Sequence, residues 1–502
     1  MDAVVLAAGA GTRFRRTAAS CPKPLYRLFG ISLVERAIRV ARQAGCRRVL
    51  VVTGHEAEAV ERAVQAAGRP WVETVRAVDW ERGNGASLLA VRGRVQSPFL
   101  LLMADHVVDP ALVRQVVAAA RRRAVELAEG GVLLLVDRRL DQVHDLAEAT
   151  KVRTAGDGRR IVAIGKDLDA FDAVDTGVFV AGHGLLDELA ALAAGAGGAG
   201  GTGGAGGLSE PLTLTAAARR LAATGRLAAV PAEAGWWVDV DDAAALAQAR
   251  RRLLDHATAS GGDGPVARWL NRRLSRPLSA VLAAAGVGPN GATLLAFVTT
   301  LAGAAAFAAG WPWAGGILCQ LGSVLDGCDG ELARLRLEAQ PRGAFLDTVL
   351  DRYADAAVVA GLAVGAWAAG AGPVSTAALA LAAMAGLPLS ALMKDRLQLL
   401  RVTADRPAAR MPKADGAGVG EEAEGRGGGG RRFDPLRDDP PWLRWLPGNR
   451  DGRYLLVCLA GLAGSPLLAL VLLAVVTHAL ALGRLVHGWR ALTVEGTAAE
   501  GS

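Results

Sequence analysis

The stretch Leu325–Asp351, LDGCDGELARLRLEAQPRGAFLDTVLD, decides the fold of the second half of this 502-residue chain. It carries four carboxylates at fixed spacing inside apolar flanks: Asp326, Asp329, Asp347 and Asp351. Carboxylates three and four residues apart share one helix face, so two adjacent helices would bring four oxygen ligands to one point. Charged groups at membrane depth are costly, and four together predict metal ions and a phosphate substrate.

The composition changes sharply near residue 260, which divides the chain. Short apolar runs alternate with charged helical segments before it, and long Ala, Leu, Val and Gly stretches of membrane-crossing length follow it. We expect a soluble α/β domain of Rossmann-like fold over residues 1–255 and an all-α polytopic membrane domain over residues 256–502. The net charge of +7 sits in arginine clusters beside apolar runs, which fits anionic lipid headgroups and predicts no nucleic-acid partner.

The apolar runs of the second half predict six transmembrane helices. They cover about residues 293–309, 313–334, 344–370 and 374–393, with two more within 455–482. That last stretch is barely long enough for a hairpin, so a single tilted helix is the alternative. The loops WPWAG, AGAGP and AGSP contain no Lys or Arg, whereas the other loops are rich in them. This asymmetry predicts a multi-pass protein of the cell membrane, with the N-terminal domain and both active sites facing the cytoplasm.

Three further segments carry expectations of their own. Residues 265–286 mix arginines with Trp and Leu, which is typical of an amphipathic helix at headgroup level; a plain linker is the alternative. Residues 191–207, nearly all Gly and Ala, indicate a flexible insertion, and residues 401–445 indicate a mobile loop. Five scattered cysteines predict neither a disulfide framework nor a zinc site.

The N-terminus places a glycine loop directly after an apolar strand. Residues 4–6 are followed by AAGAGTRFRR, and PKPL follows at residues 22–25. Backbone N–H groups of such a loop bind phosphates, and Arg13 and Lys23 would add positive charge at the carboxyl end of the strand. The candidate nucleotide-binding residues are Ala8, Gly9, Gly11 and Thr12. A generic Rossmann turn would explain the glycines but not PKPL.

The aspartate spacing resembles the signature of the CDP-alcohol phosphotransferase family, Asp-x2-Asp-Gly-x2-Ala-Arg-x8-Gly-x3-Asp-x3-Asp, without departure. The resemblance implies a di-metal membrane enzyme that transfers a substituted phosphoryl group from a CDP-alcohol to a second alcohol and releases CMP. Asp326, Asp329 and Asp347 would hold the metal ions. Asp351 would be a further ligand and the general base on the acceptor hydroxyl. The residues that would accommodate the nucleotide are Gly330, Ala333, Arg334 and Gly343.

The combination LAAGxGTR and PKPL resembles nucleotidyltransferases that couple a nucleoside triphosphate to a sugar phosphate, over roughly residues 1–255. The resemblance implies catalytic roles for Lys23 and Arg13. It also implies Mg²⁺, with Mn²⁺ as the alternative, held by Asp105 and Asp239. Candidate contacts to the base are Asn84 and Ser87, and to the sugar phosphate Lys166 and Asp175.

Lys166, Asp241 and His106 carry alternatives, and for Lys166 the alternative is a solvated surface lysine. Asp241 ranks below Asp239 as a metal ligand, because Asp241 or Asp242 is expected to cap the helix that follows. His106 shows no metal-ligand spacing, so a structural role is favoured over a catalytic one.

The fusion of a nucleotide-activating half to a CDP-alcohol-consuming half points to cytidine and to a shared intermediate. With RGNGASL, MADH, WWVDVD and GNRDGRYL in this order, the chain resembles bifunctional enzymes in which an inositol-1-phosphate cytidylyltransferase is joined to a CDP-inositol:inositol-1-phosphate transferase. The resemblance implies CTP, inositol-1-phosphate and CDP-inositol as substrates, and a homodimer through the membrane domain. One alternative is synthesis of a phospholipid with a head group that the first domain activates. Another is a membrane-anchored binding scaffold with inactive domains, which the complete motifs disfavour.

Overall fold

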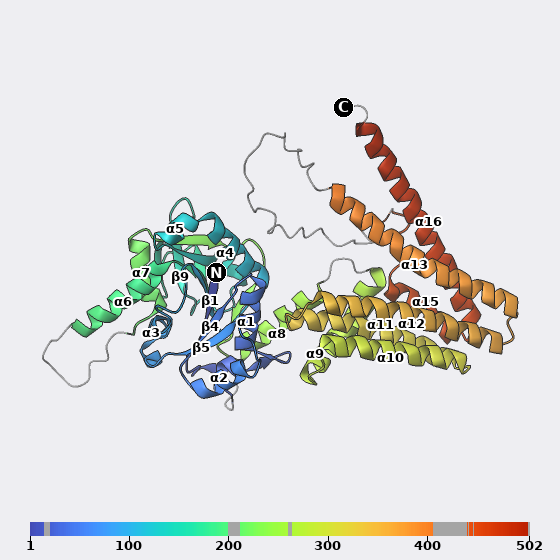
Figure 1. Ribbon diagram of the computed structural model, residues 1–502, viewed down its shortest axis with the longest axis horizontal. Helices are drawn as coiled ribbons and strands as arrows, with labels where there is room; N and C mark the ends of the chain where they lie inside the picture. The colour runs from blue at the N-terminus through green and yellow to red at the C-terminus, as the bar shows by residue number, and fades with distance from the viewer. Residues whose placement is uncertain are drawn as a thin grey trace. The chain divides into compact units, whose positions relative to one another are not determined.

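The computed structural model describes residues 1–14, 21–198, 211–259, 264–404, 439, 441–444 and 446–499. Its contacts divide the chain into two compact units, Met1–Leu253 and Leu254–Ser502 (Figure 1). The N-terminal unit is built around a mixed β-sheet, and the described residues of the C-terminal unit form helices without strands. This confirms the predicted Rossmann-like first half and the predicted helical second half.

The sheet of the N-terminal unit has a parallel part that brings strand ends to one edge. Its strands are β1 (Asp2–Ala7), β4 (Val49–Thr53), β5 (Val72–Arg76), β6 (Phe99–Met103), β8 (Val132–Asp137), β9 (Lys151–Thr154), β10 (Ile161–Gly165), β11 (Ala173–Ala181) and β12 (Leu227–Pro231). The order is β10-β9-β11-β6-β1-β4-β5, and β8 pairs with β11 and β12. Because β1 runs parallel to β4 and β6, their carboxyl ends meet where ligands bind in such folds.

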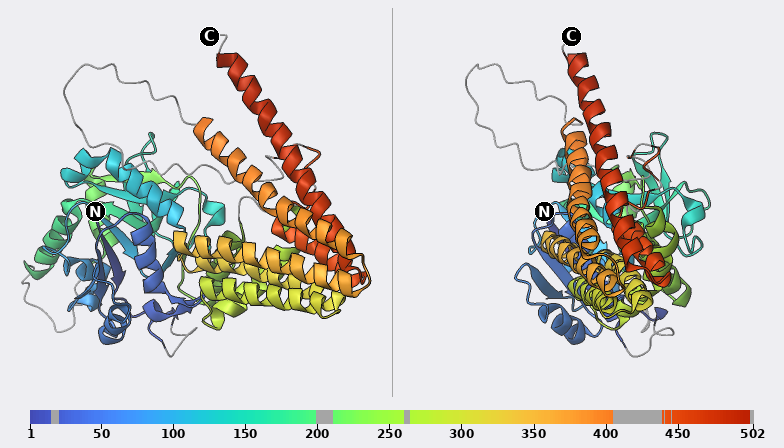
Figure 2. Two further views of the ribbon diagram at one scale, coloured as in Figure 1. Left: turned by 45° about the vertical axis from the view of Figure 1, so that its right-hand side comes forward. Right: turned by 90° about the vertical axis from the view of Figure 1, so that its right-hand side faces the viewer.

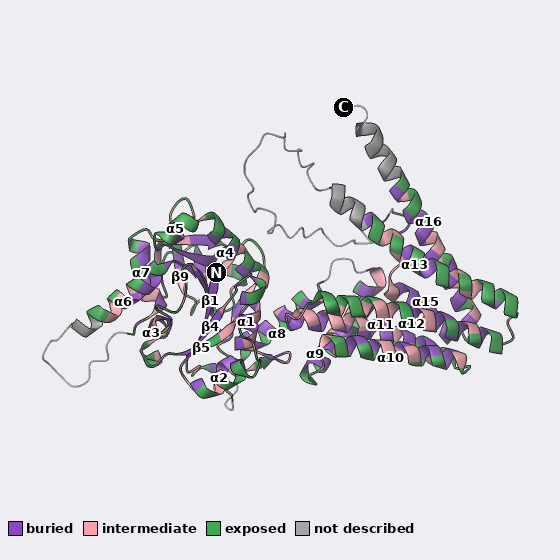
Figure 3. Ribbon diagram, in the orientation of Figure 1, coloured by how far each residue is buried: buried purple, intermediate pink, exposed green. Residues whose placement is uncertain are grey.

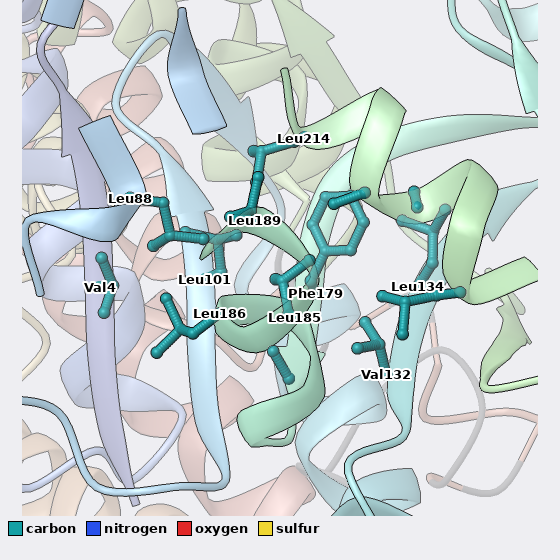
Figure 4. Packing of buried hydrophobic residues seen from close by; sticks show 14 of the residues in the cluster. Val4, Leu88, Leu101, Val132, Leu134, Phe179, Leu185, Leu186, Leu189 and Leu214 are labelled. Atoms are coloured by element: carbon teal, nitrogen blue, oxygen red, sulfur yellow. The ribbon is translucent and has the colours of Figure 1, made fainter. Parts of the chain in front are cut away.

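Helices cover the sheet because its central strands β1, β4 and β6 are buried and apolar on both faces. The helices are α1 (Leu33–Gln43), α2 (Ala57–Gln65), α3 (Asn84–Leu89), α4 (Pro110–Arg122), α5 (Ala124–Ala128), α6 (His183–Gly198), α7 (Leu214–Ala223) and α8 (Ala243–Thr258). On one face, Val4 and Leu101 of the sheet lie in one buried cluster with Leu88 of α3 and Leu189 of α6 (Figure 4). Two short ribbons complete the unit: β2 (Arg27–Leu28) with β3 (Ile31–Ser32), and β7 (His106–Val108) with β13 (Trp237–Asp239).

The Gly- and Ala-rich segment 191–207 is not a flexible insertion throughout, as the sequence suggested. Helix α6 continues through its first part to Gly198, and residues 199–207 lie outside the described residues. Alanine is the strongest helix former, and the helix is already anchored by buried Leu185 and Leu189. Most of the predicted loop 401–445 also lies outside the described residues, apart from the end of helix α13, Asp439 and residues 441–444.

The C-terminal unit is a bundle of long helices. They are α9 (Arg272–Ala284), α10 (Pro289–Ala308), α11 (Pro312–Leu335), α12 (Pro341–Ala368), α13 (Pro373–Ala404), α15 (Arg450–Leu462) and α16 (Pro466–Ala499), with a π-helical turn at Ala267–Asn271. Helices α10, α11 and α12 lie side by side, and α13 lies beside α16 (Figure 2). The α10–α12 crossing depends on glycine, since a Cβ at Gly361 would lie 2.2 Å from the carbonyl oxygen of Ala304.

Three described helices are long and apolar enough to cross a membrane: Pro289–Ala308, Pro373–Leu397 and Pro466–Trp489. Helices α11 and α12 carry the four aspartates, which reduce their apolar character. The stretch expected to hold the last two spans forms α15 and α16, broken at Gly464 (φ +73°), instead of one tilted helix. Helix α15 alone, at about 20 Å, is shorter than a hydrocarbon core of about 30 Å. Exposed residues run along the helices of the bundle (Figure 3), and many of them are large and apolar, among them Leu294, Phe345 and Val475.

Helix α9 and the turn before it direct their polar side to the protein and their apolar side outward. The hydroxyls of Ser275 and Ser279 donate to the carboxylate of Glu331 on α11, at 2.5 and 2.6 Å. Trp269 and Leu274 are 69% and 50% exposed. A water-soluble amphipathic helix has the opposite arrangement, so this polarity fits a segment that faces lipid.

Candidate active sites

The first site lies at the carboxyl ends of β1 and β6. The loop after β1 contains Gly9, which is exposed and would have no atom within 4 Å of an added Cβ. Gly11 adopts φ +57°, and a Cβ there would lie 2.9 Å from the Cβ of Lys23. The loop therefore packs on Lys23 at Gly11 and leaves its backbone open at Gly9. Ala8 is buried and Thr12 is exposed.

Lys23 is the centre of this site. Its ammonium group lies 2.8 Å from Asp105 Oδ2, 2.6 Å from Asp241 Oδ1 and 3.8 Å from Asp239 Oδ1. Arg13 pairs with Asp241 at 2.7 Å. Burial alone would lower the pKa of Lys23, but Asp105, Asp239 and Asp241 together raise it. The lysine therefore stays charged, as stabilisation of a phosphate requires.

Asp239 lies opposite His106 in the β7–β13 ribbon, and Asp105 directly precedes His106 in the chain. One ligand atom of each of the three residues lies within 4.8 Å of the others. Asp239 Oδ1 is buried and has no hydrogen-bond partner among the described residues. Burial would raise the pKa of Asp105, but Lys23 and His106 lower it to about 2, so the carboxylate is charged. The two carboxylates offer the oxygen ligands that a hard divalent cation prefers.

His106 is hydrogen-bonded to strand β11. Its Nδ1 lies 2.9 Å from the carbonyl oxygen of Thr176, its Nε2 lies 3.6 Å from Asp239 Oδ2, and its ring stacks near Trp237. Burial would lower the pKa of His106, but Asp239 and Asp105 raise it to about 10. Gly177, with φ +74°, leaves room for the ring, since a Cβ there would lie 2.5 Å from it.

The remaining candidates of the N-terminal unit, Asp175 and Lys166, have different surroundings. Asp175 lies on β11, where its Oδ1 accepts from the Gly177 N–H at 2.7 Å. Lys166 is exposed and shares Glu148 with Arg13, at 3.2 and 3.6 Å. These residues remain predicted substrate contacts.

Asn84 and Ser87 are engaged within the protein. Asn84 Oδ1 accepts from Leu214 N at 2.9 Å, and the buried Ser87 hydroxyl donates to Gly83 O at 3.2 Å. These bonds give both residues a structural role, and base recognition by them remains a prediction. Asp242 caps α8 through Ala245 N at 2.8 Å, the role that the sequence had left open between it and Asp241.

The second site lies at the C-terminal end of α11 and the N-terminal end of α12. The sequence predicts that these ends lie on the cytoplasmic side. Asp326, Asp329 and Asp347 each offer an oxygen within 4.8 Å of the others. Asp329 Oδ2 accepts from Thr293 Oγ1 of α10 at 2.7 Å. Asp347 Oδ1 is buried and has no partner among the described residues. Three close carboxylates with an unpartnered oxygen fit a divalent cation.

Arg450, at the start of α15, is a functional candidate that lies in the stretch GNRDGRYL but received no role from the sequence. Its guanidinium donates to Asp326 Oδ1 at 2.5 Å and also to Asp351 Oδ1, so it links α11 to α12. The separation of 99 residues from Asp351 explains why no local spacing revealed it. Asp355, the next carboxylate on α12, instead accepts from the Tyr454 hydroxyl at 3.1 Å.

The predicted nucleotide-binding residues of this site lie along the same two helices. Gly330 faces the Arg334 guanidinium, which would lie 3.3 Å from an added Cβ. Arg334 Nε donates to the carbonyl oxygen of Ala257 at 2.6 Å. Gly343 faces Asn290 Oδ1, 3.3 Å from an added Cβ, and Ala333 is half-buried. Nucleotide contact by this set remains a prediction.

Known proteins match both halves. Residues 3–200 match the MobA-like NTP transferase domain, and residues 287–413 match CDP-alcohol phosphatidyltransferase. The chain is 35% identical to the bifunctional IPC transferase and DIPP synthase of Rubrobacter xylanophilus, over 97% of this chain and 96% of that one. The chain belongs to this family. It is therefore an enzyme with a nucleotidyltransferase half and a CDP-alcohol phosphotransferase half.

Two further proteins extend the comparison. The bifunctional IPC transferase and DIPP synthase of Archaeoglobus fulgidus is 33% identical over 71% of this chain and 64% of its own length. A solved structure described as the inositol-1-phosphate CTP transferase from T. maritima is 24% identical, covering 50% of this chain and 95% of its own, with a TM-score of 0.41.

Proposed function

We propose that this chain catalyses two successive transfers. In the first, the phosphate of inositol-1-phosphate attacks the α-phosphorus of CTP, which gives CDP-inositol and pyrophosphate. In the second, a hydroxyl of another inositol-1-phosphate attacks the inositol-bearing phosphorus of CDP-inositol, which releases CMP and gives di-myo-inositol phosphate phosphate. The supporting observation is the presence of two separate carboxylate clusters, each beside its own arginine or lysine, in a chain of this bifunctional family.

In the first transfer, catalysis is positioning and charge neutralisation. The open backbone at Gly9 would bind the triphosphate, and Lys23, held by Asp105 and Asp241, would stabilise charge on the phosphates. Arg13 would assist from the exposed side. Asp105 and Asp239 would hold Mg²⁺. Lys166 and Asp175 would orient the inositol phosphate.

In the second transfer, Asp351 would take the proton of the acceptor hydroxyl. Asp326, Asp329 and Asp347 would hold the cations, with Thr293 orienting Asp329. Divalent cations bound here would stabilise charge on the entering and leaving oxygens. Two separate domains, over residues 1–255 and 256–502, would thus pass CDP-inositol from the first site to the second.

The turns of the bundle gather at the end opposite to the aspartates. Added Cβ atoms at Gly315 and Gly365 would touch Phe307, and one at Gly461 would lie 2.5 Å from Pro312 O. Along α11, Asp326 lies about 21 Å from Pro312 at 1.5 Å per residue. In a core of about 30 Å the aspartates would therefore lie near one membrane face.

Exposed tryptophans and the charge of the loops support a membrane orientation. Trp311, Trp313 and Trp367 are exposed at the turn end, as in the aromatic belt of a membrane interface. The three turns there contain no Lys or Arg. We therefore infer six spans in the cell membrane, with α15 as a short one, and both sites open to the cytoplasm.

Pyrophosphate release tests the first transfer. The purified full chain should release pyrophosphate from CTP only when inositol-1-phosphate is present. Asp105→Asn should reduce this rate at least about 100-fold, because it removes a metal ligand and a partner of Lys23. Asp242→Asn is the matched control, since Asp242 only caps α8, and should change the rate less than about threefold. Equal rates for the two variants would exclude the proposed site.

A further inference from the structure

Arg450 occupies a position between two catalytic helices that a cation could also take. Its side chain is only 10% exposed and its guanidinium contacts Asp326 of α11 and Asp351 of α12. The ring of Tyr454 lies 5.1 Å from the guanidinium carbon. One positive charge is therefore shared between two carboxylates, one from each helix.

A buried polar network fixes the backbone from which Arg450 reaches. The next residue, Asp451, accepts from the Ser323 hydroxyl at 2.9 Å and from the amide of Asn271. The Asn271 amide also donates to Ser323 Oγ at 3.2 Å. Because Ser323 lies one turn before Asp326 on α11, this network sets Arg450 against Asp326 in a defined position.

The four carboxylates divide into two groups around Asp326. Asp326 lies in the close cluster with Asp329 and Asp347, and Asp351 lies outside that cluster, where Arg450 contacts it. Arg450 Nε is buried and has no hydrogen-bond partner among the described residues. The guanidinium is thus incompletely satisfied where it lies, which lowers the cost of moving it.

We infer that Arg450 is a resident counter-cation, and that a second divalent cation binds between Asp326 and Asp351 by displacing it. The inference rests on the proposed phosphotransferase site. A guanidinium and a divalent cation on the same oxygens repel each other strongly in a half-buried site. A first cation, held by Asp326, Asp329 and Asp347, meets less competition. The two cations should therefore bind with unequal affinity, the second weakened by Arg450.

Titration with Mn²⁺ tests this directly, with free Mn²⁺ followed by its EPR signal. The protein is the detergent-purified full chain carrying Asp105→Asn and Asp239→Asn, which remove the ligands of the first site. No nucleotide or inositol phosphate is added. With Arg450 present, one Mn²⁺ should bind tightly and one weakly. Arg450→Gln should tighten the weak Mn²⁺ at least about tenfold and change the tight one less.

Arg453→Gln is the matched control. Arg453 lies one turn further along α15 than Arg450, and the two side chains are 6% and 10% exposed. Arg453 pairs with Asp355 at 3.5 Å and not with the carboxylate cluster. This variant should keep the Mn²⁺ affinities of the parent. Arg450 reaches both carboxylates through Nη1 alone, and Arg450→Lys keeps the charge on a shorter side chain, so it should give an intermediate affinity. It also provides the measurement if Arg450→Gln does not fold, as judged by helicity and size-exclusion profile.

The outcomes separate this inference from the proposed function. A weak-site affinity that is unchanged or lowered in Arg450→Gln, or unchanged in Arg450→Lys where only that variant folds, overturns the displacement and leaves Arg450 as a structural link. Absence of any Mn²⁺ binding by the parent overturns both the displacement and the metal site of the proposed phosphotransferase. The two Mn²⁺ affinities can differ and depend on residue 450 while the protein shows no transferase activity. That result supports the displacement and contradicts the proposed function.

Discussion

At the scale of single residues, spacing along the chain predicts which carboxylates lie together, but not which distant side chains contact them. The grouping of Asp326, Asp329 and Asp347 follows from helical periodicity, which is local. Arg450 comes from a distant helix, so only the folded bundle brings it to Asp326. Likewise, the sequence placed Asp239 above Asp241 as a metal ligand, and the structure pairs Asp241 with Lys23 and Arg13.

Asp351→Asn tests the proposed general base. Supplied with ready-made CDP-inositol, the variant should bind nucleotide normally and lose at least about 100-fold in kcat, the usual contribution of general base catalysis. Asp329→Asn should in addition weaken the tightly bound Mn²⁺, because Asp329 belongs to the close carboxylate cluster and Asp351 does not. Single-turnover rates and CMP binding distinguish the two effects. Near-normal turnover by Asp351→Asn would move the role to another group, with Asp355 the first to test.

Asp175→Asn should show a pH-dependent change in stability. Burial raises the pKa of Asp175 to about 6, although the Gly177 N–H bond opposes this. The folded state thus binds a proton more tightly than the unfolded chain, and this stabilisation is present at low pH and lost as the pH rises through about 6. We expect the variant to melt higher than wild type at pH 8, with a smaller difference at pH 4.5. Tryptophan fluorescence during heating measures this, and a pH-independent difference would contradict the assignment.

At the scale of elements, the hydrophobic pattern predicted most helices and strands but not their ends or their surroundings. The strand β1, Asp2–Ala7, includes the apolar residues 4–6 that the sequence placed before the glycine loop. The start of segment 191–207 was predicted wrongly. Its glycine content suggested flexibility, but α6 continues through it to Gly198. The outward apolar side of α9 depends on the buried Glu331, which no periodicity in α9 itself indicates.

A spin label at residue 274 tests whether this side faces lipid. We expect Leu274→Cys, labelled in a Cys21→Ser background because the other four cysteines are buried, to collide more with oxygen than with a water-soluble nickel chelate in vesicles. A label at Asp157, in an exposed turn of the N-terminal unit, is the control and should show the reverse. Equal nickel accessibility at both positions would refute the interfacial helix.

At the scale of the whole molecule, the two motifs predicted two folds and their chemistry, because each motif lies on its own local elements. The number of membrane spans is less predictable from the sequence, because α15 is short and its position is set by packing against α11. The pairing of a nucleotide-activating half with a CDP-alcohol-consuming half carries the central claim, that one chain makes and then uses CDP-inositol.

Phosphorus NMR of the full chain with CTP, Mg²⁺ and inositol-1-phosphate tests that claim most directly. We predict pyrophosphate and CDP-inositol first, and then CMP together with a new water-soluble phosphodiester that retains a phosphomonoester. In Asp351→Asn, CDP-inositol should accumulate, while Asp105→Asn should form none unless CDP-inositol is supplied. A lipid-soluble product formed only when a lipid alcohol is present, or absence of pyrophosphate with folded protein, would contradict the account.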